Sequence, residues 1–239
     1  MSNTHSKRAV VVFGKVPRPG RVKTRLTPTL SAKTASSIYQ AFLFDVFDIV
    51  NCAAQASEVT IDRYFVCAMS EDDTVEDAQR LLPRGWSLLD ERGLDLGDRI
   101  NAACEDIEAE TVVVLGSDSP TMPQRRIFEA FSAIENEDVW AKKPFVLGPT
   151  KDGGYYLVAM SQVRPAIFSN VIWSTTEVLD KTRQNSLQAG IPLVELGEGY
   201  DIDYVTDFEQ ALADAEQGEA YRTAKAIKSV LSELNQGKP

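Results

Sequence analysis

Positively charged side chains gather near the start of this sequence, in a chain that is acidic overall. The first 44 residues contain no Asp or Glu, whereas the whole chain has a formal net charge of -10. Five of the early cations fall within residues 15–25, here called the cation loop: Lys15, Arg18, Arg21, Lys23 and Arg25. Local positive charge in an acidic protein favours an anionic ligand.

The cation loop follows an apolar run and precedes a helical pattern, an order typical of a phosphate-binding loop at the carboxyl end of a strand. Pro17, Pro19 and Gly20 fix its path and lower the entropic cost of holding its cations. A solvated basic loop and a nucleic-acid-binding arm are the alternatives. Nucleic acid is disfavoured because the loop is short, lacks aromatic residues and belongs to an acidic protein.

Lys23 and Arg25 flank Thr24 at the end of the cation loop, where they could hold a diphosphate or triphosphate. The guanidinium would bind in a bidentate fork, and the ammonium would act as a point charge. The Gly-Lys-Ser/Thr ending is absent, so the loop is not a Walker A motif.

Two aspartates are candidate metal ligands. Asp118 follows a buried apolar run, where it could bind Mg²⁺ together with water and phosphate oxygens, or could cap the next helix. Asp203 lies two residues after Asp201, and on an extended segment these two carboxylates would point the same way and could share a cation. Thr206 and Asp207 could equally cap the following helix. The metal site is convincing only if Asp118 and Asp203 act as a pair.

The segment 148–154 presents Lys151 and Asp152 in a connection marked by Gly153 and Gly154. An ordinary turn is one interpretation, because Asp-Gly-Gly suits a hairpin. In the functional interpretation Asp152 lies beside an acceptor hydroxyl, and the glycines let a substrate approach the backbone.

The segment 173–176 is expected to start a helix with hydroxyl caps, the first of which is Ser174. Its Trp173 is either a core residue, which we slightly favour, or a wall of the acceptor pocket.

Composition limits the chemistry further. The only histidine, His5, lies near the amino terminus, which makes a catalytic triad or a histidine metal site unexpected. Cys52, Cys67 and Cys104 fit neither a disulfide framework nor a zinc pattern, so we expect reduced, mostly buried thiols. No signal-peptide or membrane-helix pattern is found, and we expect a soluble, cytoplasmic protein with one domain spanning residues 1–239.

Apolar runs alternate with amphipathic stretches, which predicts an α/β fold with a largely parallel sheet. The predicted strands cover residues 8–14, 59–69, 86–89, 111–115, 144–148, 154–159 and 191–196. The predicted helices cover residues 31–54, 71–82, 96–107, 123–134, 174–189, 204–215 and 218–235. Ligands of such sheets bind beyond the carboxyl ends of the strands, so the loops after residues 13, 115, 147 and 196 are expected to share one edge.

Five segments in order carry a family resemblance. They are Phe13-Gly14-Lys15 with the rest of the loop to Leu26, then Leu96–Arg99, Leu115–Thr121, Gly148–Tyr155 and Trp173–Thr175. Together they resemble the bacterial glycosyltransferase-like transferases associated with radical SAM and selenodomain proteins. That family is itself similar to 2-phospho-L-lactate guanylyltransferase, whose Lys-Ser-Arg-Leu is matched by Lys23–Leu26.

The resemblance implies a GT-A type, Rossmann-like nucleotide-diphospho-sugar transferase fold with a mostly parallel seven-stranded sheet. It also implies Mg²⁺ or Mn²⁺ on Asp118 and Asp203, and a nucleotide over the first half of the sheet. The predicted nucleotide contacts are Phe13, Gly14, Lys15, Gly20, Lys23, Thr24, Arg25, Gly116 and Ser117; the predicted acceptor contacts are Lys151, Asp152, Gly153, Gly154, Trp173 and Ser174. Two departures are the missing Gly-x-Gly-x-Arg loop and Gly116 in place of the first Asp of an Asp-x-Asp motif.

Three alternative functions are compatible with these motifs and with the resemblance. In nucleotidyl transfer, a phosphorylated acceptor attacks an NTP without a general base, and Lys23 and Arg25 bind the pyrophosphate. In glycosyl transfer from an NDP-sugar, Asp152 is the candidate base. The third is a catalytically silent nucleotide-binding partner protein. The expected partners are a nucleotide and a small acceptor, with no nucleic acid or membrane; a homodimer is compatible with the sequence, which leaves the oligomeric state open.

Overall fold

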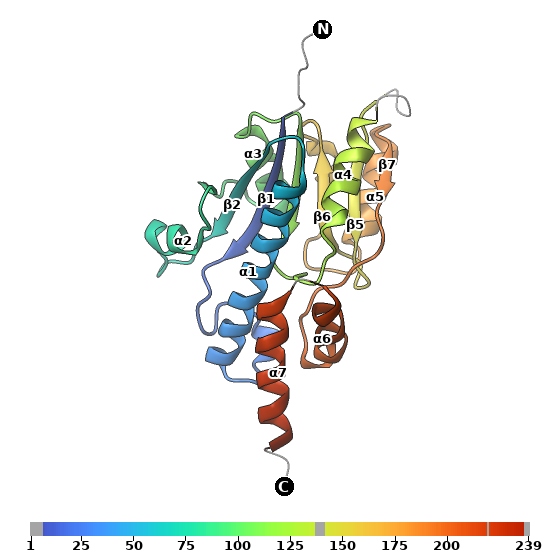
Figure 1. Ribbon diagram of the computed structural model, residues 1–239. Coiled ribbons are helices and arrows are strands. Elements are labelled where there is room, and N and C mark those ends of the chain that lie inside the picture. The colour runs from blue at the N-terminus through green and yellow to red at the C-terminus, as the bar shows by residue number, and fades with distance from the viewer. Residues whose placement is uncertain (1–6, 137–141, 219, 237–239) are drawn as a thin grey trace.

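The computed structural model describes residues 7–136, 142–218 and 220–236 (Figure 1). His5 lies outside the described residues. At the centre is a seven-stranded sheet in the order β3-β2-β1-β4-β6-β5-β7. Only β6 runs antiparallel to its neighbours. The strands are β1 (Arg8–Lys15), β2 (Ile61–Ala68), β3 (Ser87–Leu89), β4 (Thr111–Gly116), β5 (Phe145–Pro149), β6 (Tyr155–Met160) and β7 (Leu193–Glu195).

Helices connect the strands and close the chain. The α-helices are α1 (Ala32–Ala56), α2 (Val75–Leu81), α3 (Leu96–Glu105), α4 (Arg125–Glu135), α5 (Val178–Gln188), α6 (Phe208–Gln217) and α7 (Tyr221–Gln236). Three 3₁₀ turns are η1 (Thr24–Leu26), η2 (Pro165–Phe168) and η3 (Val205–Asp207). The expected α/β fold, with a mostly parallel sheet, is confirmed.

Some predicted helix starts were wrong. α2 begins at Val75, four residues later than expected, because Thr74 and Asp77 form a capping box that sets the first turn there. α5 begins at Val178 and its N-cap makes no side-chain hydrogen bond, so the expected hydroxyl cap at Ser174 is wrong. Ser174 has a φ of 63°, which takes the backbone out of the right-handed helix.

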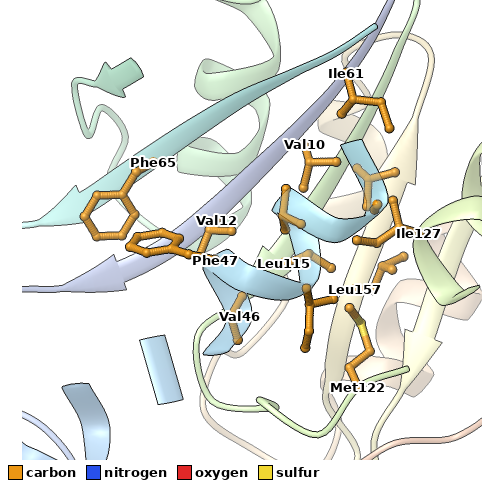
Figure 2. Packing of buried hydrophobic residues seen from close by; sticks show 14 of the residues in the cluster. Val10, Val12, Val46, Phe47, Ile61, Phe65, Leu115, Met122, Ile127 and Leu157 are labelled. Carbon is orange, nitrogen blue, oxygen red and sulfur yellow. The ribbon is translucent and has the colours of Figure 1, made fainter. Parts of the chain in front are cut away.

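Apolar side chains cover both faces of the sheet. Alternate residues of β1 face opposite sides, so Val10 and Val12 join one core cluster and Ala9 and Val11 join another. The first cluster packs under α1 and α4; in Figure 2, Phe47 of α1 lies near Phe65 of β2, with their rings edge to face and 5.3 Å apart. The second cluster packs under α3, η2 and α5.

A third cluster lies beyond the end of the sheet where the parallel strands finish, here called the carboxyl edge. α6 and α7 lie on this side of the molecule, and α7 packs along α1 (Figure 1). The cluster contains Phe42 of α1 and Phe208 of α6, and it also buries Leu26 and Ile202. Leu26 directly follows the cation loop and Ile202 lies between two aspartates, so this core brings both segments to the same place.

The loops after β1, β4, β5 and β7 leave the carboxyl edge together, as predicted, because these strands are parallel. Within the described part of the chain, no helix combines the length and apolar character needed to cross a membrane.

Candidate functional site

The side chain of Lys23 lies between the two predicted metal ligands. Its Nζ is 2.6 Å from Oδ1 of Asp118 and 2.9 Å from Oδ1 of Asp203. The Lys23 side chain is only 3% exposed, whereas that of Asp118 is 45% exposed and that of Asp203 is 24% exposed. Residues 180 positions apart in the chain therefore meet at one point on the carboxyl edge.

The local backbone fixes Lys23 in this position. Lys23 adopts left-handed torsion angles, with φ 46° and ψ 44°, at the start of η1. Its neighbours Val22 and Leu26 are buried and anchor the loop on either side. The ammonium also lies 5.6 Å from the centre of the Phe42 ring, on the face that α1 turns toward the site.

Neighbouring opposite charges set the protonation states of Lys23 and Asp203. Burial alone would lower the pKa of Lys23, but the Asp118 and Asp203 carboxylates outweigh it and hold the pKa above its ordinary value. Burial would likewise raise the pKa of Asp203, but Lys23 and Arg25 hold it below its usual range. Lys23 is therefore a buried ammonium, and Asp203 is a carboxylate.

Arg25 completes the pairing of Asp203. Its guanidinium donates to the other carboxylate oxygen of Asp203 and lies over the ring of Tyr204, at 5.8 Å. Asp207 accepts hydrogen bonds from the backbone N–H groups of Asp203 and Tyr204 at 2.9 and 2.7 Å, which orders the segment before α6. Asp207 therefore caps this turn, one of the two interpretations that the sequence allowed.

Asp201 is a third carboxylate at the site. It accepts a hydrogen bond of 2.5 Å from Ser119 Oγ, and the backbone N–H of Ile202 donates to the carbonyl of Asp118 at 3.1 Å. Burial, reinforced by the nearby charge of Asp118, raises the pKa of Asp201 to about 6. Asp201 faces Ser119 instead of sharing a cation with Asp203, so the two carboxylates have different partners.

Tyr39 of α1 links the two strand ends that flank the site, and the sequence analysis did not select it. Its buried hydroxyl accepts from the backbone N–H of Lys15 at 2.8 Å and is 2.9 Å from Oγ of Ser117. Gly14 makes room for it, since a Cβ there would lie 3.0 Å from the hydroxyl. Burial, then the charge of Asp118, raises the pKa of Tyr39. The signal that could have found it is a hydroxyl on the apolar face of a helix.

The first half of the cation loop is paired differently. Arg18 binds the carboxylates of Asp73 and Asp77 and, at 3.0 Å, the carbonyl of Asp72. Arg21 lies 3.4 Å from Asp72. These acidic partners lie in the segment before α2 and its first turn, so Arg18 and Arg21 anchor the loop to its neighbour.

The remaining predicted nucleotide contacts have varied surroundings. Phe13 packs against the second core cluster, and Ser117 is buried beside Tyr39. Lys15, Gly20 and Thr24 are exposed, and the φ of 77° at Gly20 explains the glycine there. Gly116 is exposed too, with no atom within 4 Å of where its Cβ would be. Gly116 thus leaves the backbone beside Asp118 open to approach.

A cavity of about 740 Å³ is bordered by Arg25 and Asp203. It is lined by Lys151 and Asp152 from the turn between β5 and β6, by Ser174 and the next two threonines, and by the segment from Tyr200 to Gln210. Three of the predicted acceptor residues therefore surround one space, next to the ion pairs of Lys23 and Arg25.

Asp152 and the two glycines that follow it also shape the turn between β5 and β6. Asp152 accepts from Thr150 Oγ1 at 2.6 Å, which closes the turn. Gly153 has a φ of 88°, and a Cβ on it would lie 2.2 Å from the carbonyl oxygen of Thr176. Gly154 has a Cβ position 3.1 Å from Thr150 Oγ1. These glycines are explained by the turn itself, without a substrate.

Trp173 packs edge to face against Tyr155, with ring centres 6.3 Å apart, and lies beside Phe168. It is a member of the second core cluster, and it does not line the acceptor cavity. The core interpretation of Trp173 is the one that the packing supports.

A second cavity, of about 650 Å³, lies between the start of α4 and the end of α6. None of the residues predicted for the site lines this cavity. It shares Tyr200 with the acceptor cavity, and the Tyr200 hydroxyl donates to Asp214 at 2.6 Å.

The fold is that of the nucleotide-diphospho-sugar transferases and cytidylyltransferases. A protein from Desulfovibrio desulfuricans G20, provisionally named a nucleotide-diphospho-sugar transferase, is 24% identical and has a TM-score of 0.80 over 96% of this chain and 98% of that chain. A cytidylyltransferase from Leptospira borgpetersenii is 10% identical, with a TM-score of 0.55 over 98% and 99%. CMP:2-keto-3-deoxy-manno-octonic acid synthetase, in complex with CTP, is 13% identical, with a TM-score of 0.52 over 88% and 98%. At these identities the likeness shows the fold alone.

The sequence itself identifies the family. Residues 51–175 match the family described as "Uncharacterized protein conserved in bacteria (DUF2064)", so the chain belongs to DUF2064. No curated protein matches the sequence. Four of the five motif segments lie inside the matched range, while Lys23, Arg25 and Asp203 lie outside it. The finer resemblance, to the radical-SAM-associated transferases and the guanylyltransferase, stays a prediction.

Proposed function

We propose that this protein is a divalent-metal-dependent nucleotidyltransferase that moves a nucleotidyl group from an NTP to a small phosphorylated acceptor. The observation that carries the proposal is the meeting of Lys23 with Asp118 and Asp203 at the carboxyl edge. Ligands of open α/β sheets bind there. Cations for phosphate and carboxylates for a metal are the two components that phosphoryl chemistry requires.

The carboxylates fit a hard divalent cation. One point lies within 3 Å of an oxygen of both Asp118 and Asp203, as the position of the Lys23 ammonium demonstrates. Among the described residues, no group of three or more His, Cys, Asp or Glu side chains is arranged to hold a metal. Mg²⁺ commonly binds through one or two carboxylates, with water and substrate phosphates supplying the remaining oxygens. Asp118 and Asp203 would hold Mg²⁺ or Mn²⁺, which would neutralise charge on the phosphates.

In the proposed reaction an oxygen of the acceptor phosphate attacks the α-phosphorus of the NTP. A new phosphorus–oxygen bond forms, the bond to the β-phosphate breaks, and pyrophosphate leaves with the electron pair. The acceptor is already an anion, so no side chain has to remove a proton. Lys23 and Arg25 would bind the negative charge that develops on the pyrophosphate.

The cavity beside Arg25 provides room for an acceptor. At about 740 Å³, its volume suits a small phosphorylated molecule. Its cations are Arg25 and Lys151. Its four carboxylates already accept hydrogen bonds from the protein: Asp152, Asp201, Asp203 and Asp207. Hydrogen bonds from neutral donors leave carboxylates negatively charged, so an acceptor phosphate would have to bind beside Lys151 and Arg25, with the metal offsetting the remaining negative charge.

Glycosyl transfer from an NDP-sugar is the second candidate, and the position of Asp152 favours it. Asp152 lines the same cavity as Arg25, where a carboxylate could take the proton of an acceptor hydroxyl. In that reaction the same cations would hold a departing nucleoside diphosphate.

The test is a product assay with Mg²⁺ or Mn²⁺ and a panel of NTPs, NDP-sugars and phosphorylated acids and sugars. CTP is the first nucleotide to try, because the structurally similar synthetase is complexed with CTP. Pyrophosphate release that requires both acceptor and metal supports nucleotidyl transfer, and NDP release from an NDP-sugar supports the alternative. Nucleotide binding without either product across the panel would leave a silent binding protein as the better account.

A further inference from the structure

The contacts of Lys23 imply more than phosphate binding. Its ammonium occupies the point at which a metal bound by both Asp118 and Asp203 would lie, because it is within 3 Å of an oxygen of each. Two cations a few ångströms apart repel each other strongly, most of all where water is scarce. Lys23 in this position and a divalent metal on the same two carboxylates therefore exclude each other.

The surroundings of Lys23 allow its ammonium to leave without unfolding the loop. Val22 and Leu26 are buried anchors, and the N–H of Leu26 donates to the carbonyl of Lys23 at 2.9 Å. The backbone is thus held on both sides of the left-handed residue. Displacement of the ammonium would therefore take a change in the side-chain torsion angles of Lys23 while the backbone of the loop stays in place.

Asp203 and Asp118 can also exchange the Lys23 ammonium for another partner. Asp203 keeps Arg25 as a partner when the ammonium departs, so it is not left as an unpaired charge. Asp118 is 45% exposed and can accept water or a metal in place of the ammonium. Exposed Gly116, beside it, leaves open the space that a nucleotide phosphate needs.

We propose that Lys23 is an internal counter-ion that competes with the divalent metal, so that metal enters the site efficiently only with the nucleotide, whose phosphates receive the displaced ammonium. The inference rests on the proposed function for the identity of the incoming ligands. It adds a property that the proposed function does not require: metal and nucleotide bind cooperatively, and Lys23 causes part of the coupling.

The decisive experiment measures Mn²⁺ affinity, by calorimetry and by electron paramagnetic resonance, in the wild type, Lys23→Met and Lys33→Met. Lys33→Met is the matched control, because it removes one exposed cation near the start of α1 that forms no ion pair with either aspartate. Without nucleotide we expect Lys23→Met to bind Mn²⁺ about tenfold tighter than the wild type or more, and Lys33→Met to match the wild type. The double variant Lys23→Met/Asp118→Asn should lose the gain.

The outcomes separate this inference from the proposed function. Equal Mn²⁺ affinity in the wild type and Lys23→Met would overturn the counter-ion role while the metal site stands. If no variant bound Mn²⁺, even with CTP or GTP present, both the proposed metal site and this inference would be wrong. A gain that persists in the Asp118→Asn double variant would place the metal elsewhere and overturn the inference.

A measurement on the wild type covers the case in which Lys23→Met does not fold. The ammonium of Lys23, with its two carboxylate partners, should give a slowly exchanging ¹⁵N-lysine signal in nuclear magnetic resonance. We expect Mg²⁺ alone to leave this signal unchanged and Mg²⁺ with a nucleotide to shift it. A shift caused by Mg²⁺ alone would contradict the proposal.

Discussion

The two halves of the cation loop carry the same kind of charge but belong to different structures. Arg18 and Arg21 pair with aspartates of a neighbouring surface segment, between β2 and the first turn of α2. Lys23 and Arg25 pair with aspartates that follow β4 and β7, across the carboxyl edge. The ion pairs of Arg18 and Arg21 can be explained by the stability of the fold alone. Those of Lys23 and Arg25 join distant segments at the place where ligands bind in this fold.

This difference shows that a cluster of like charges need not share one task. In the sequence, the five cations of the loop looked like one phosphate-binding unit. Four of them fall into two groups by their partners: Arg18 and Arg21 form an anchor, and Lys23 and Arg25 form a site. Exposed Lys15 belongs to neither group. The predictions below test that division: changes in the site should affect activity more than stability, and changes in the anchor should do the reverse.

The largest effect on activity is expected for Asp118→Asn. The substitution removes a charge that would hold the metal, so turnover should fall by about 10³-fold or more. Asp118 is half-exposed, and its amide analogue can still accept a hydrogen bond, so the thermal midpoint should change little. Steady-state kinetics and thermal unfolding measure the two quantities. A large loss of folding with Asp118→Asn would instead assign Asp118 a structural role.

Arg25→Lys should lower activity next most strongly. Lysine keeps the charge but loses the planar fork, so we expect kcat to fall about tenfold to a hundredfold. The guanidinium is 53% exposed, so the free energy of unfolding should change by less than about 1 kcal/mol. Arg21→Lys, the same exchange in the anchor half, is the matched control and should leave kcat near the wild-type value.

Tyr39→Phe tests the link between the two strand ends. It deletes the hydroxyl that accepts from the Lys15 N–H and contacts Ser117. Leaving a buried donor without a partner should cost about 1–3 kcal/mol of unfolding free energy. Because Ser117 adjoins Asp118, kcat should also fall, by roughly tenfold. Chemical unfolding and kinetics on the same preparation check this; a stability loss with unchanged kcat would make Tyr39 purely structural.

Much of the fold could be predicted from the sequence because buried parallel strands have an unmistakable pattern. Residues 9–13 and 112–115 are continuous apolar runs, and the bounds predicted for the two strands that contain them differ from the observed ones by at most one residue. Helix starts were less certain, because residues 71–82 contain several candidate caps and the capping box at Thr74 decides between them.

The candidate site was predictable in outline only. Asp118 was selectable because it follows a buried apolar run, and Asp203 because it lies in an acidic cluster with Asp201. The pairing of both with Lys23 depends on contacts between residues far apart in the chain. Tyr39 and Asp73 escaped selection for the same reason, since Tyr39 lies 24 residues from Lys15 and Asp73 lies 55 residues from Arg18. Trp173 and the glycines of the turn at 153–154 show the opposite case, in which tertiary packing accounts for residues that a motif suggested were functional.

Arg18→Ala should have the smallest effect on activity, and its effect on the stability of the fold should depend on pH. Burial alone would raise the pKa of Asp73, but the hydrogen bond from Arg18 and those from Ser70 outweigh it and hold the pKa below its ordinary value. A carboxylate with a lowered folded-state pKa stabilises the fold fully above its unfolded pKa, near 4. That stability is lost as the pH falls through the folded pKa.

The anchor therefore predicts a particular pH dependence of stability. At pH 7 the Arg18→Ala variant should be less stable than the wild type by about 1–2 kcal/mol, because Asp73 is 4% exposed and loses its cation. Below about pH 4 the difference should shrink as Asp73 becomes protonated in both proteins. Urea unfolding at pH 7, 5, 4 and 3 measures it, and Arg21→Ala, whose partner Asp72 is 74% exposed, should show almost no difference at any pH. If Arg18→Ala lowered kcat as much as Arg25→Lys, the two halves of the loop would form one functional unit after all.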